Sequence, residues 1–110
     1  MPEISVIERA CNRAAKALDH AWSDEIALLR LARLLKAVNR DLILLLQWSA
    51  AGTKSTGAGS RAERSLRTME MHLRHVLLEH AALTRQQMHV HLNEAVYEAF
   101  DVLELLQTAC

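Results

Sequence analysis

The strong helix breakers of this chain are confined to two short stretches, and this distribution constrains the fold more than any other feature. All three glycines fall between residues 50 and 60, and the one proline, Pro2, lies where a first helical turn tolerates it. Two blocks without glycine or proline remain, residues 3–49 and 61–108. β-Sandwiches and β-barrels need many turn residues such as glycine and proline. The scarcity of these residues here favours an all-α protein.

Apolar residues in both blocks recur at alternating spacings of three and four, the periodicity of a buried helix face. The stripes are Ile4, Ile7, Cys11, Ala14 and Leu18; Leu28, Leu31, Leu35, Val38, Leu42 and Leu45; Leu66, Met69, Leu73, Val76, His80 and Leu83; and Leu92, Val96, Ala99, Leu103 and Leu106. Ser23 can cap a helix, and Thr84-x-x-Gln87 matches a capping box. These signals predict helices at about 3–21, 24–49, 61–83 and 85–108.

Short turns between successive helices place neighbours antiparallel. We therefore predict one helical domain over residues 1–110, an antiparallel up-down-up-down four-helix bundle with a flexible Gly/Ser/Thr loop at 50–60. The alternative is two long helices that pass through residues 22–24 and 83–85. Such a hairpin would have to dimerise into a four-helix bundle to bury its apolar stripes.

Charge and cysteine usage limit the class of partner. Thirteen basic and thirteen acidic side chains cancel, so we expect neither nucleic acid nor a membrane as partner. The longest aliphatic run, residues 42–46, is far shorter than the roughly 20 residues that span a bilayer. We expect a cytoplasmic protein, because the chain opens without a signal peptide and Cys11 and Cys110 suggest reduced thiols.

Arginines of the third predicted helix match acids of the fourth. If the turn lies at residues 83–84 and the two helices are antiparallel, a residue on the third helix lies opposite the residue on the fourth whose number brings the sum to about 167. The predicted ion pairs are Arg74 with Glu94, Arg67 with Asp101 and Arg64 with Glu104. Exposed pairs of this kind are worth about 0–1 kcal/mol each, so they would select register more than they would stabilise.

Apolar side chains in excess of one stripe per helix indicate contact with another protein. The second predicted helix also carries a basic row, which is ordinarily a solvated face but can dock an acidic partner or the acidic face of a second copy. The predicted function is therefore non-enzymatic protein binding, as a homodimer or as an adaptor, chaperone-like or regulatory protein. The predicted interface residues are Leu44, Met71, Leu78, Arg30, Arg33 and Arg40.

Six histidines suggest a second function, a metal- or haem-binding bundle. An up-down-up-down bundle brings His20, His80 and His89 toward one end, and the second choice of ligands is the level pair His75 and His91. Zinc or haem would be the cofactor. The main prediction is no cofactor, because Glu-x-x-His, His-Glu-x-x-His and Cys-x-x-Cys-His patterns are missing from the sequence.

Catalysis has weaker support. Cys11 lies on an apolar stripe and Cys110 is terminal, so neither is held as a nucleophile. Glu98-x-x-Asp101 has the magnesium-binding spacing seen in all-α nucleotide pyrophosphohydrolases, but the Glu-Glu-x-x-Glu motif of that family is missing. We therefore do not expect an enzyme.

Trp48 and Gly52 before the glycine-containing segment, with Tyr97-x-x-x-Asp101 near the C-terminus, resemble the small secreted WXG-type helical hairpins. This resemblance implies an exported hairpin that pairs with a second chain. The sequence departs from the family because Trp48 and Gly52 are four positions apart, where the motif has W-x-G. The alternative is that Trp48 and Tyr97 are ordinary amphipathic packing residues.

Overall fold

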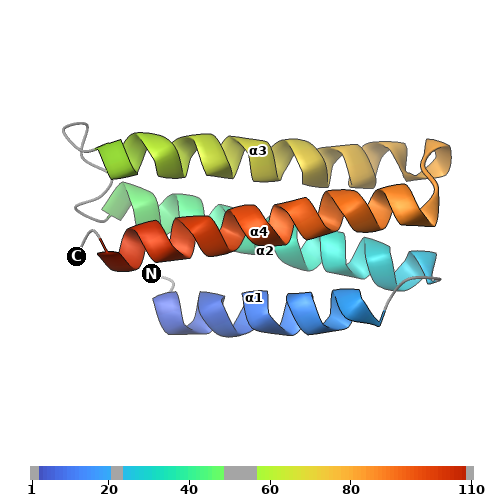
Figure 1. Ribbon diagram of the computed structural model, residues 1–110, viewed down its shortest axis with the longest axis horizontal. Helices are drawn as coiled ribbons and strands as arrows, with labels where there is room; N and C mark the ends of the chain where they lie inside the picture. The colour runs from blue at the N-terminus through green and yellow to red at the C-terminus, as the bar shows by residue number, and fades with distance from the viewer. Residues whose placement is uncertain (1–2, 21–23, 49–56, 109–110) are drawn as a thin grey trace.

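The computed structural model describes residues 3–20, 24–48 and 57–108, which are almost entirely helical. The helices are α1 (Ile4–Asp19), α2 (Glu25–Trp48), α3 (Gly57–Glu79), the short 3-10 helix η2 (His80–Ala82) and α4 (Arg85–Thr108). The four long helices alternate in direction, so α1 begins and α4 ends at the same end of the molecule (Figure 1). This arrangement confirms the predicted up-down-up-down bundle and rules out two uninterrupted long helices.

The helices pack around one core, with α1 and α3 on opposite sides. Both α1 and α3 pack against α2 and α4, and α2 also contacts α4 across the middle. The contact between α3 and α4 is the most extensive, and α2 meets α3 over a smaller area. Side chains of both α2 and α3 line a groove along the seam between these two helices.

The predicted apolar stripes form this core. The whole α2 stripe is buried, as are Cys11 and Ala14 on α1 and Leu92 and Ala99 on α4. On α3 the stripe is buried from Leu66 to Val76, whereas His80 and Leu83 beyond its end are only partly covered. Burial of these aliphatic side chains supplies the main stabilising free energy of the bundle.

Local capping signals set two helix starts. Thr84 and Gln87 form the predicted capping box: Gln87 N–H donates to Thr84 Oγ1 at 3.0 Å, and Thr84 N–H donates to Gln87 Oε1 at 2.8 Å. At α2, Asp24 Oδ1 accepts a hydrogen bond from Ala27 N–H at 3.2 Å. Ser23, the predicted cap, lies outside the described residues.

Helix α3 is displaced toward the N-terminus relative to its predicted range. It begins at Gly57 and ends at Glu79, where the sequence predicts a helix from 61 to 83. The predicted loop at 50–60 is thus helical from Gly57 onward, and residues 49–56 lie outside the described part of the chain.

Two of the three predicted ion pairs between α3 and α4 are wrong. Arg74 pairs within α3, with its Nη2 3.2 Å from Glu70 Oε1, and Arg67 lies on the side of α3 that faces α2. Glu70 is four positions before Arg74, so the two side chains are neighbours on the surface of α3. The pair of Arg64 with Glu104 stays a prediction.

A membrane-spanning helix must be about 20 residues long and predominantly apolar, which can be checked for the described helices. None of them combines the length and the apolar character that crossing a bilayer needs.

Candidate protein-binding groove

A groove of about 600 Å³ runs along the seam between α2 and α3. Its apolar lining comes from both helices, with Ile43 and Leu44 on α2 and Leu73, Leu77 and Leu78 on α3. Leu78 is 75% exposed, although a leucine gains free energy when it is buried. The groove therefore presents apolar surface that residues 3–20, 24–48 and 57–108 leave uncovered.

Basic side chains border the α2 side of the groove. Arg33, Lys36 and Arg40 are exposed lining residues, and their spacings of three, four and seven positions place them on one face of α2. Among the described residues that line the groove, Glu70 is the single acid, and it pairs with Arg74. The α2 rim thus carries an excess of positive charge.

Asn39 anchors the two helices beneath this groove. Its side chain is buried, and Nδ2 donates a hydrogen bond to the carbonyl oxygen of Leu66 at 3.1 Å. A buried amide that is satisfied in this way holds α2 and α3 in one register. Asn39 was not among the residues predicted to be functional, and its place beside Val38 in the apolar stripe is the signal that could have identified it.

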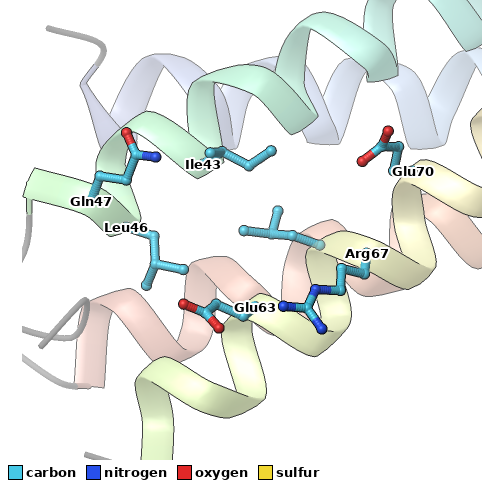
Figure 2. Close-up of a pocket in the computed structure, with 7 residues that line it drawn as sticks. Ile43, Leu46, Gln47, Glu63, Arg67 and Glu70 are labelled. Atoms are coloured by element: carbon cyan, nitrogen blue, oxygen red, sulfur yellow. The ribbon is translucent and has the colours of Figure 1, made fainter. Parts of the chain in front are cut away.

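A smaller pocket of about 200 Å³ continues the groove toward the end of α2. Figure 2 shows its lining, in which Ile43, Leu46 and Gln47 come from α2 and Glu63, Arg67 and Glu70 come from α3. Ile43, Gln47 and Glu70 line both cavities, so the two are continuous. Acidic and basic side chains both line this smaller pocket. The excess of basic side chains is therefore confined to the part of the groove bordered by Arg33, Lys36 and Arg40.

The structure unites most of the predicted interface residues. Leu44, Leu78, Arg33 and Arg40 all line the groove. Met71 and Arg30 do not. Met71 is exposed on α3, and Arg30 lines a separate pocket between α1 and α2.

The first predicted histidine set takes three separate positions. His89 is buried, and its Nε2–H donates to the Leu18 carbonyl at 2.9 Å. His80 Nδ1 lies 3.3 Å from Glu25 Oε1, and His20 is exposed at the end of α1. Within residues 3–20, 24–48 and 57–108, no three potential ligands gather where a metal ion could be held.

The second predicted pair does come together, with His72 as a third member. The ring centroids of His75 and His91 are 4.8 Å apart, and Nδ1 of His72 is 2.9 Å from Nδ1 of His91. His75 Nε2 also lies 3.2 Å from Glu79 Oε2. Desolvation, followed by the nearby His72 and His75, lowers the pKa of His91 below 6.5. One Nδ1 must donate to the other, so both are engaged in this bond rather than facing a shared ion.

Comparison of the chain with models of known protein families, with curated proteins and with solved structures finds no match. The two aromatic residues behind the WXG resemblance are both on the surface. Trp48 is 74% exposed and Tyr97 is 62% exposed, so most of each side chain lies outside the core, and their interpretation as ordinary amphipathic packing residues stays a prediction. The single-chain bundle also differs from the two-helix hairpin that the resemblance implies.

Proposed function

We propose that the protein is a non-enzymatic binding module, which takes a helix of another chain into the groove between α2 and α3. The observation that carries this proposal is the joining of an uncovered apolar lining with a basic rim. Apolar contact supplies affinity, and charge on the rim selects the partner and sets its orientation. The partner is either another protein, for which this chain acts as an adaptor or regulator, or a second copy.

A helix is the occupant that fits the lining best. Leu44 and Leu78 flank the groove and project from opposite helices, so a third helix laid between them would contact both. Recognition of this kind uses apolar residues at positions i, i+3, i+4 and i+7 of the occupant. An acidic edge on that helix would meet Arg33 and Arg40 on the rim.

The state of Cys11 is consistent with a binding role in a reducing compartment. Cys11 is a free, buried cysteine whose pKa is raised to about 11, mainly by desolvation and secondarily by Glu8. A thiol of this kind stays protonated near neutral pH and is a poor nucleophile. We therefore propose a cytoplasmic location and assign Cys11 to packing.

The test uses a synthetic acidic amphipathic helix of about 18 residues, with leucine on one face and glutamate beside it. Calorimetry would measure its affinity, and NMR chemical shifts would locate it. We expect shifts along α2 and α3, and an affinity that falls more than about tenfold in a groove-reversed variant, Arg33→Glu/Arg40→Glu.

The matched control is Arg13→Glu/Lys16→Glu, which makes the same change in net charge at two exposed positions on α1. This control should bind the peptide with nearly wild-type affinity. An equal loss of peptide affinity in both variants would show that binding responds to net charge alone and would overturn the proposal. Shifts confined to helices other than α2 and α3 would do the same.

A further inference from the structure

Helix α4 carries a stripe on its outer face that the bundle does not use. Val90 is 53% exposed and Tyr97 is 62% exposed, and both lie opposite the buried residues of the helix. Glu94 and Asp101 are exposed between and beyond them. All four lie at spacings of three, four or seven positions, so they share one face. We call these four residues the α4 stripe.

The chemistry of the α4 stripe complements that of the groove. The groove has leucines with a basic rim, whereas the α4 stripe has a valine and a tyrosine with two carboxylates. Tyrosine gives a large contact area at low conformational cost and is common at the centre of protein interfaces. The thirteen basic and thirteen acidic residues balance over the chain, but these two surfaces separate part of that charge.

The spacings of the two surfaces also agree. Arg33 and Arg40 are seven positions apart on α2, and Glu94 and Asp101 are seven positions apart on α4. At a rise of 1.5 Å per residue, each pair spans about 10.5 Å along its helix axis. Both ion pairs can therefore form together when one helix lies along the other.

We propose that the occupant of the groove is a second copy of this chain, which lays its α4 stripe along the groove of the first. Glu94 and Asp101 then lie beside Arg33 and Arg40, and Val90 and Tyr97 cover the exposed leucines. This inference rests on the proposed binding function of the groove and names its partner. No segment of the second copy has to unfold, because the α4 stripe is already exposed.

The contact joins two unlike surfaces. The groove lies between α2 and α3, whereas α4 packs between α1 and α3 and turns its stripe away from the core. Each bound copy therefore keeps one groove or one α4 stripe free. Head-to-tail contacts of this kind add further copies until a ring closes. A closed homodimer would form only if each copy laid its α4 stripe in the groove of the other at the same time.

A mixing experiment with two charge-reversed proteins tests the inference. The groove-reversed variant has an acidic groove beside its acidic α4 stripe. A stripe-reversed variant, Glu94→Arg/Asp101→Arg, has a basic stripe beside its basic groove. Each should stay monomeric alone because both its surfaces carry the same sign, and an equimolar mixture should associate because every contact is again between opposite charges.

Sedimentation velocity at up to about 1 mM chain would follow the association. We expect the association constant of each reversed variant to be at least about tenfold below that of the wild type, with recovery in the mixture. The Arg13→Glu/Lys16→Glu control should associate like the wild type.

The inference is overturned if the wild type stays monomeric over this range, or if the reversed variants associate as well as the wild type. It is also overturned if the equimolar mixture of the two reversed variants does not recover the association seen in the wild type. The peptide experiment separates the two proposals, since a groove that binds the acidic peptide in a monomeric protein keeps its binding function and loses only the second copy as occupant.

Discussion

At the scale of single residues, two polar side chains do most to define how the helices meet. Asn39 donates to the Leu66 carbonyl and joins α2 to α3, and His89 donates to the Leu18 carbonyl and joins α4 to α1. Both side chains are buried, where an unsatisfied polar group is costly. Each bond therefore selects one alignment of two helices that aliphatic contacts alone would leave free to slide.

Replacement of Asn39 tests the first of these bonds. Asn39→Ala should lower the free energy of unfolding by about 1–2 kcal/mol, since it removes a buried hydrogen bond and leaves a small cavity. Urea unfolding followed by circular dichroism measures this change. Asn12→Ala, at an exposed position on α1, is the control and should leave stability the same or slightly higher. Equal effects at both positions would contradict the role of Asn39.

The cluster of His72, His75 and His91 should make stability depend on pH. The pKa of His91 is lowered from 6.5 in the folded state, so between that lowered pKa and 6.5 the unfolded chain binds more protons. Stability should therefore fall as the pH is lowered through this window. The groups on α3 around His91 are His72 and His75, with Glu79 beside His75, so the slope reports the whole cluster.

The measurement is the unfolding temperature of the wild type and of His91→Gln between pH 7.5 and 5.5. The variant should lose less stability than the wild type over this range, because glutamine does not titrate. His20→Gln, at an exposed histidine, serves as the control and should follow the wild type. An unchanged pH dependence in His91→Gln would argue against the cluster as its source.

At the scale of helices, the start of α4 depends on the Thr84 capping box. Thr84→Ala should cost about 1 kcal/mol of stability and speed amide exchange in the first turn of α4, because it exposes the Gln87 N–H. Thr68→Ala is the matched control, since the Thr68 hydroxyl only donates to the Arg64 carbonyl within α3. Slow exchange at residues 85–88 in Thr84→Ala would show that another group holds the helix start.

The sequence predicts local features of these helices well and contacts between them less well. The buried stripes and the Thr84 capping box depend on residues within two turns of one another. The spacing of these residues in the sequence was therefore sufficient to predict both features. The α3–α4 ion pairs depended on a rotation about the helix axis that spacing does not define. Arg67 consequently faces α2, and Arg74 pairs with Glu70 on its own helix.

The groove shows the same division between what could be predicted and what could not. Leu44, Leu78, Arg33 and Arg40 were found because they depart from the core pattern of their own helices. Asn39 was missed because its partner, the Leu66 carbonyl, is a main-chain group that no side-chain pattern reveals. Arg30 belonged to the same basic row, but it lies nearer α1 and lines a different pocket.

At the scale of the whole molecule, the separation of charge predicts how the protein responds to salt. Self-association should weaken by about tenfold between about 50 and 500 mM salt, because the Debye length falls below the distance over which the two surfaces attract. Sedimentation velocity at both salt concentrations checks this. The unfolding temperature at a concentration where the protein is monomeric should change little, because the ion pairs among the described residues join exposed side chains. Stronger association at high salt would indicate a purely apolar contact.

The bond between His89 and Leu18 also has a consequence for synthesis on the ribosome. Its two residues are 71 positions apart, an interval of about 4–14 seconds at ordinary elongation rates. During that time α1 can pack only against α2, because its second neighbour, α4, has not been made. One flank of its apolar stripe stays open to water until α4, whose Gln107 donates to Glu8 on α1, has been made, and a chaperone that recognises nascent chains has that interval in which to bind.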